Sequence, residues 1–169
     1  MKKTALIYSS LTGNAKKVGE AIFEVIEGEK TIFSVEEVTP EMIKSYDRVI
    51  FGFWVDKGTA DSRIRKLLGK TSGKEVAFFG TLGAEPDSDH GKKVYRRVTE
   101  LCTKNNTLLG GFLSLGKVAD KLVERMGKFP INLIHPLTPE RLARIENAST
   151  HPNQQDFENA QKYFKMILG

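Results

Sequence analysis

Short apolar runs alternate with amphipathic segments over about the first 115 residues, and this alternation constrains the fold more than any other feature. The runs predict five strands, at residues 4–8, 31–38, 48–53, 75–79 and 107–115. Apolar positions spaced three and four apart predict helices between them, as in residues 14–27. Strands that alternate with helices pair in parallel and carry helices on both faces of the sheet. The sequence therefore predicts a doubly wound α/β fold with a five-stranded parallel sheet.

The pattern is looser beyond residue 115. Residues 131–135 fit either a strand or a loop. Helices are expected from Pro139 to about residue 148 and from Asn153 onward, with Phe164 on the buried side of the last one. A length of 169 residues suits one domain. We therefore predict a single domain over residues 1–169, in which 115–152 elaborate the C-terminal part and extra helices follow the sheet.

Composition excludes several classes of protein. Apolar residues make up 40% and charged residues 28% of the chain, as in soluble globular proteins. The apolar run at residues 49–55 is broken by Gly52 and is too short to cross a bilayer. The apolar stretch near the start is too short for a signal peptide. Cys102 is the only cysteine, which excludes an internal disulfide and a cysteine-built metal site. We therefore expect a cytoplasmic protein without a membrane partner.

Charge is spread unevenly along the chain. The net charge is +5, with seven basic and nine acidic side chains in residues 1–56 and 19 and 12 in residues 57–169. The basic excess fits ordinary solvated surface or, alternatively, a face that binds an anion or a partner. No aromatic stripe or nucleic-acid motif accompanies Lys92, Lys93, Arg96 and Arg97, so we predict no nucleic-acid partner.

Hydroxyl and amide side chains gather where the first strand passes into the first helix. Ligands of open parallel sheets bind beyond the carboxyl ends of the strands, and the free N–H groups at a helix start favour phosphate. Gly13 permits a positive φ. The alternative is that Thr12 or Asn14 merely caps the helix. We predict a phosphate-binding turn without a basic side chain, formed by Ser9, Ser10, Leu11, Thr12, Gly13, Asn14 and Ala15.

The segment 10–15 resembles the phosphate loop of flavodoxins, whose pattern is Ser/Thr-x-Thr-Gly-Asn-Thr. The resemblance implies an FMN-binding electron carrier with strand order 2-1-3-4-5. It also implies that Ser10, Thr12 and Asn14, with the N–H groups of Gly13 and Ala15, hold the FMN phosphate. Ala15 departs from the pattern, since the family usually has a hydroxyl there, so one hydrogen bond of roughly 1–2 kcal/mol should be missing. Whether Ser9 replaces that hydroxyl stays open.

The second loop at the same edge, residues 54–61, places an aromatic side chain where the family binds the isoalloxazine ring. Trp54 offers a flat apolar surface to the ring or, alternatively, closes the edge of the core. Val55 and Asp56 follow it, and Gly58 is expected to turn the backbone toward flavin N5. Thr59 and Asp61 fit a helix cap equally well.

The third loop, residues 80–91, begins where the pyrimidine end of the flavin is expected. Thr81, Leu82 and Gly83 are predicted to offer backbone N–H groups. The loop lacks the Tyr or Trp with which flavodoxins usually cover the outer ring face, so that face is open or covered by Leu82, His90 or a partner. His90 is a proton donor in one interpretation and structural in the other.

Other catalytic chemistry finds no support in the sequence. The three histidines, His90, His135 and His151, lack the spacing of a metal site. No Gly-x-Ser-x-Gly motif is present for a serine nucleophile.

Several segments are also similar to a narrower branch, the flavodoxin-like accessory proteins of bilirubin reductase. They are residues 53–61, 80–84, 86–91 and 135–141. This similarity implies that the partner is a larger flavin-dependent reductase and that the tail is a docking surface.

The sequence is compatible with three functions. The first is an FMN-binding redox protein that passes electrons to a partner reductase in bilirubin or tetrapyrrole reduction. The second is an NAD(P)H-dependent quinone or flavin reductase, and the third is a non-redox binding module of the same fold. Whether the chain is itself an enzyme, and its oligomeric state, stay open.

Overall fold

A five-stranded parallel sheet forms the centre of the computed structural model, which describes residues 1–128, 130–134 and 136–169. The strand order is β2-β1-β3-β5-β6, and each neighbouring pair is parallel. The strands are β1 (Thr4–Tyr8), β2 (Lys30–Ser34), β3 (Arg48–Asp56), β5 (Glu75–Leu82) and β6 (Thr107–Leu115). Without the short antiparallel β4 (Thr59–Ala60), this is the order 2-1-3-4-5, so the predicted doubly wound fold is confirmed.

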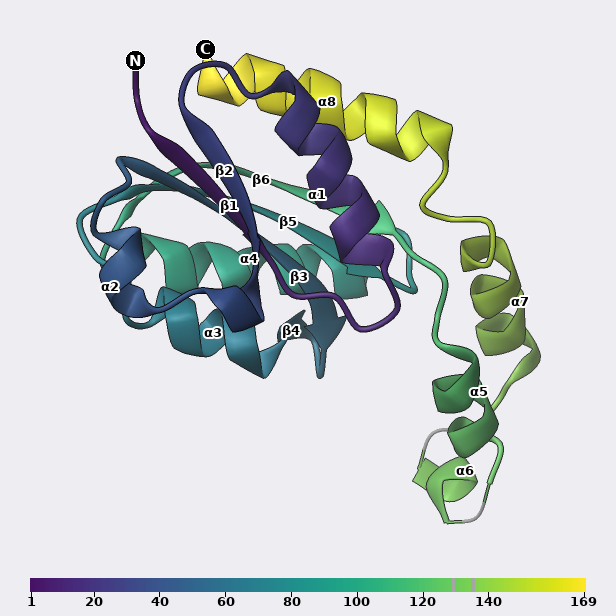
Figure 1. Ribbon diagram of the computed structural model, residues 1–169. Helices are drawn as coiled ribbons and strands as arrows, with labels where there is room; N and C mark the ends of the chain where they lie inside the picture. The colour runs from purple at the N-terminus through teal and green to yellow at the C-terminus, as the bar shows by residue number, and fades with distance from the viewer. Residues whose placement is uncertain (129, 135) are drawn as a thin grey trace.

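Helices cover both faces of the sheet (Figure 1). α1 (Asn14–Val25) and α8 (Gln154–Leu168) pack side by side on one face. There Phe164 of α8 meets Phe79 of β5 edge to face, and both are fully buried. The opposite face carries α3 (Ser62–Leu68) and α4 (Asp89–Thr103), with the short α2 (Pro40–Ile43) beside them. Each face therefore has its own apolar core, as the alternating sequence predicts.

The segment after residue 53 is a hairpin rather than the predicted loop. β3 continues to Asp56, and β4 returns antiparallel to it. Lys57 and Gly58 form the turn with φ values of 50° and 77°. Positive φ at both central residues is the geometry of a two-residue hairpin turn, which explains why a glycine stands second.

Two other boundaries differ from the prediction. The second strand ends at Ser34, and a 3-10 helix (Val35–Glu37) follows because the Ser34 hydroxyl and the Glu37 carboxylate form a capping box. Residues Ile131–Ile134 form the short helix α6 instead of a strand or loop. His135, the last residue of that expected segment, lies outside the described residues.

Residues 116–152, here called the arm, project beside the sheet (Figure 1). The arm contains α5 (Asp120–Met126), α6 and α7 (Pro139–Ala148). The Gly116 N–H donates to the Leu82 carbonyl at 2.9 Å and the Lys117 N–H to the His151 carbonyl at 2.8 Å. The two ends of the arm therefore meet at the carboxyl edge of the sheet.

No helix in the described part of the chain has the length and apolar character that crossing a membrane requires.

Candidate functional site

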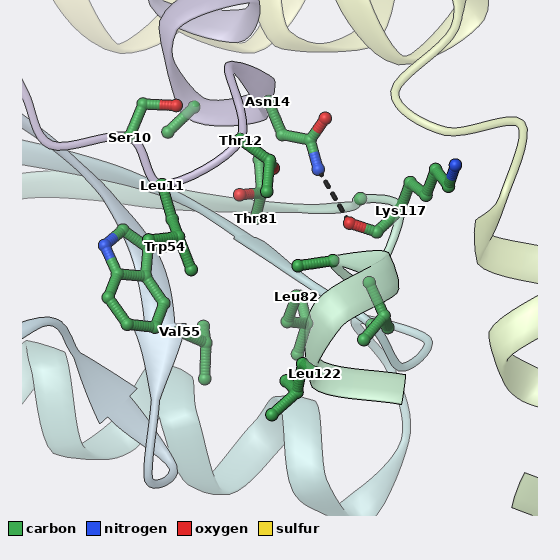
Figure 2. A pocket seen from close by; sticks show the side chains of 15 residues that line it. Ser10, Leu11, Thr12, Asn14, Trp54, Val55, Thr81, Leu82, Lys117 and Leu122 are labelled. Atoms are coloured by element: carbon green, nitrogen blue, oxygen red, sulfur yellow. Dashed lines mark hydrogen bonds between the residues drawn. The ribbon is translucent and has the colours of Figure 1, made fainter. Parts of the chain in front are cut away.

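A cleft of about 130 Å³ lies at the carboxyl edge of the sheet (Figure 2). Ten of the predicted site residues line it, and they come from all three segments named by the sequence. They are Ser10, Leu11, Thr12, Asn14, Ala15, Trp54, Val55, Thr81, Leu82 and Gly83. The arm supplies the remaining side through Gly116, Lys117, Val118, Ala119 and Leu122.

The turn between β1 and α1 presents an uncapped helix start to this cleft. Gly13 is the residue before the helix, with φ at 93°, and no side chain caps the described helix. Neither Thr12 nor Asn14 is therefore the cap, so the capping alternative is wrong. The Ser10 hydroxyl accepts a hydrogen bond from the Gly13 N–H at 3.0 Å. A Cβ built on Gly13 meets nothing within 4 Å, so the space beside this residue is open. The first N–H groups of α1 have no partner within the helix.

Asn14 and Ala15 are held by the protein itself. The Asn14 amide donates to the Lys117 carbonyl at 3.0 Å, which ties the turn to the arm (Figure 2). Ala15 is fully buried in the core between α1 and the sheet. Its small side chain therefore packs in this core and also lines the cleft.

Ser9 points away from the cleft. Its side chain is buried, and its hydroxyl donates to Asp61 Oδ1 at 3.0 Å. The structure therefore commits this hydroxyl to Asp61 rather than to the place of the hydroxyl missing at Ala15.

Asp61 is the helix cap that the sequence suggested. Its Oδ1 accepts from the Arg63 and Ile64 N–H groups at the start of α3, at 3.1 Å and 3.4 Å. Burial raises the pKa of this carboxyl, although the hydrogen bonds from Ser9 and the backbone oppose the rise. No local sequence pattern predicts the link between Asp61 and Ser9, because the two residues are 52 positions apart.

Trp54 and Val55 form one wall of the cleft, and Leu82 and Leu122 face them (Figure 2). Thr81 and Leu82 are buried at the end of β5 instead of lying in a loop. Gly83 lies against the arm, since a Cβ there would be 2.4 Å from Val118 Cγ2. Apolar side chains of the arm therefore lie beside the third loop, which has no Tyr or Trp.

Asp56, Gly58 and His90 lie apart from the residues that line the cleft. The Gly58 carbonyl at the hairpin turn accepts from Arg97 Nη1 at 3.1 Å. His90 is exposed on α4 near that turn, 3.9 Å from the position of a Cβ on Gly58. The structure therefore places these three residues at the hairpin turn and α4, beyond the cleft wall.

Lys117 is the one charged residue among the described residues that line the cleft, and its ammonium pairs with Asp120 at 3.2 Å. The other lining residues are polar at one end of the cleft and apolar at the other. Among the described residues, no group of three or more His, Cys, Asp or Glu side chains is placed to hold a metal ion. The arm residues that complete the cleft have no local sequence signal, because only the fold brings residues 116–122 to this edge.

Comparison with known proteins agrees with this architecture. The flavodoxin domain family matches residues 5–165. A flavodoxin-like domain-containing protein BilS from Clostridioides difficile (strain CD3) is 33% identical, over 98% of this chain and 96% of its own. A BilS protein from Clostridium symbiosum (strain WAL-14163) is 28% identical, over 95% and 93%. A solved flavodoxin from the domain Archaea superposes with a TM-score of 0.62 at 17% identity, over 98% and 96%. The chain therefore belongs to the flavodoxin domain family.

Proposed function

We propose that the protein binds FMN in this cleft and passes electrons to a partner reductase. The observation that carries the proposal is the turn at residues 10–15, where an uncapped helix start and an open space beside Gly13 favour a phosphate group. A flavoprotein of Lactobacillus acidophilus NCFM with a comparable fold (TM-score 0.51) was solved in complex with FMN.

The turn would hold the phosphate through main-chain N–H groups and the hydroxyls of Ser10 and Thr12. Asn14 contributes its backbone N–H, because its side-chain amide is bonded to Lys117. The helix dipole of α1 adds to the attraction for an anion without a basic side chain.

The apolar end of the cleft fits one edge of a flat ring. Trp54, Val55 and Leu82 would shield the ring from water there, and Thr81 and Gly83 line the cleft beside them. A cavity of about 130 Å³ is smaller than ligand pockets of about 300 Å³ or more. We therefore expect the arm residues Val118 and Leu122 to move aside when the ring enters.

FMN would supply the one- and two-electron chemistry, and the chain would supply binding, orientation and shielding from water. Similarity to two BilS proteins over nearly the whole chain supports a related role for this protein. We extend the proposal to bilirubin or tetrapyrrole reduction by a flavin-dependent partner, with the arm as the docking element.

A visible absorption spectrum of the freshly purified protein tests FMN binding. We expect flavin bands, or their appearance after the apoprotein is titrated with FMN. Thr12→Val should weaken FMN binding strongly, whereas Cys102→Ser, a buried change remote from the cleft, should not. Colourless wild-type protein that cannot be reconstituted would overturn the proposal and favour a non-redox binding module.

One observation favours a second function, an NAD(P)H-dependent quinone or flavin reductase. No aromatic side chain of the described third loop lines the cleft, so a planar second substrate has room to stack once the arm moves. Steady NADPH oxidation with a quinone and no other protein would establish this activity, and its absence alongside electron transfer to a partner would establish the carrier.

A further inference from the structure

Two buried polar atoms beside the cleft lack a hydrogen-bond partner among the described residues. They are Asp61 Oδ2 and Trp54 Nε1. The first can only accept when the carboxyl is ionised, and the second can only donate. Leaving either atom unpaired in the protein interior is costly, so such atoms call for an explanation.

The two residues face each other across the β3–β4 hairpin. The ladder pairs Val55 with Ala60 and Asp56 with Thr59, so Trp54 and Asp61 are the next opposing pair. The Asp61 N–H donates to the Trp54 carbonyl at 3.1 Å, which confirms that register. Side chains at opposing positions stand on the same face, with Cβ atoms about 4.5–5.5 Å apart. The indole nitrogen lies on the side of the ring away from Leu82 and Leu122 (Figure 2).

The other carboxylate oxygen of Asp61 is already engaged. Oδ1 accepts from the Ser9 hydroxyl at 3.0 Å and from N–H groups at the start of α3. Ser9 directly precedes the turn at residues 10–15 and donates its own N–H to the Gly52 carbonyl at 2.9 Å. The carboxylate thus stands between the phosphate-binding turn and the indole that lines the other end of the cleft.

We propose that Asp61 is a positioning residue of this site. Its Oδ1 fixes the turn through Ser9. Its Oδ2, which has no direct partner among the described residues, is the acceptor for the indole N–H of Trp54 once one water molecule or a small side-chain movement joins the two atoms. This inference rests on the proposed function, because the turn and the indole are the two surfaces offered to FMN. One buried carboxylate thus aligns both surfaces, the turn and the indole.

Asp61→Asn separates this role from helix capping. Asn caps a helix as well as Asp does and keeps an oxygen for Ser9 and α3. Its NH2 group, however, is a donor facing the indole N–H, so the pair with Trp54 is lost. Trp54 is the only tryptophan, so tryptophan emission reports the surroundings of this side chain.

We expect Asp61→Asn to shift the Trp54 emission of the FMN-free protein and to weaken FMN binding about tenfold, without lowering the thermal unfolding midpoint. In a Trp54→Phe background, which has no indole N–H, Asp61→Asn should change FMN affinity far less. Ser88→Ala removes the side-chain cap of α4 away from the cleft and serves as the capping control, with wild-type emission and affinity.

Two results would overturn the assignment. One is wild-type emission and FMN affinity in Asp61→Asn, and the other is an undiminished effect of Asp61→Asn in the Trp54→Phe background. If the wild type itself does not bind FMN, the proposed function fails, while the emission of the FMN-free variants still decides the pairing of Asp61 with Trp54.

Discussion

Gly13 has a positive φ and lies directly before α1. A side chain at this position would strain the backbone and would also affect a ligand bound at the start of the helix. A Cβ on Gly13 is free of steric contact within 4 Å, but φ at 93° disfavours an L-residue by roughly 1–2 kcal/mol. Gly73, at φ 68° and equally free of contacts, is the matched control away from the cleft. We expect both Gly13→Ala and Gly73→Ala to lower the free energy of unfolding by a similar amount in urea titrations.

Only Gly13→Ala should also weaken FMN binding, because the strained backbone alters the turn whose N–H groups are proposed to hold the phosphate. Isothermal titration with FMN measures the difference. Equal FMN affinities for the two variants would contradict the assignment of the turn.

Asp61 makes stability depend on pH in a direction opposite to that of most carboxylates. Burial raises its folded-state pKa above the ordinary 3.8, so the folded protein binds this proton more tightly than the unfolded chain. Its contribution to stability is therefore complete below pH 3.8 and is lost as pH rises through the folded-state pKa. Urea unfolding of wild type and Asp61→Asn over a pH series should show wild type losing stability relative to the variant across that window. A difference that stays constant with pH would contradict the shift.

Single residues were predictable where the signal is local. The turn at residues 10–15 could be identified because its residue types and its place after a strand occur together in the sequence. The pairs Ser9 with Asp61 and Asn14 with Lys117 could not, because they join residues 52 and 103 positions apart. Only the folded sheet edge brings these partners together.

At the scale of elements, α5 contributes the side chain of Leu122 to the cleft. Leu122 is 47% exposed and belongs to no core cluster of the described residues, yet it lines the cleft. We expect Leu122→Ala to speed FMN association a few-fold with little change in stability, because less side chain must be displaced. Leu142→Ala on α7, 46% exposed and outside the cleft lining, is the control. Stopped-flow quenching of FMN fluorescence gives the rates, and slower association in Leu122→Ala would show that the side chain supports binding instead.

The longer elements followed from periodicity, but α5, with seven residues, was not predicted. The other elements that were missed are very short. β4 has two residues and α6 has four, too few to show a period of either kind. The hairpin was missed because Lys57-Gly58 is a weaker turn signal than Asn-Gly or Asp-Gly. The alternation of longer strands and helices predicts the strand order of the sheet, because short right-handed connections allow few other topologies.

Across the whole molecule, Cys102 reports how the protein opens. Its side chain is fully buried, and burial raises the pKa of the thiol to about 12. A thiol reagent should therefore react only when the fold opens, at rates that rise with urea. If opening is global, FMN at 100 times its dissociation constant should slow labelling about 100-fold, corresponding to about 2.7 kcal/mol. Rapid labelling without urea, independent of FMN, would show that α4 opens alone.

The arm enters and leaves the sheet at one point, where the Lys117 N–H meets the His151 carbonyl. A segment whose ends touch can be exchanged for another of different length without moving the strands, because closing the new loop costs little extra entropy. This junction is therefore a natural grafting point. If the arm is the docking element proposed above, chimeras that carry arms from other members of the family at this junction are expected to keep the cleft and to differ in the partners they bind.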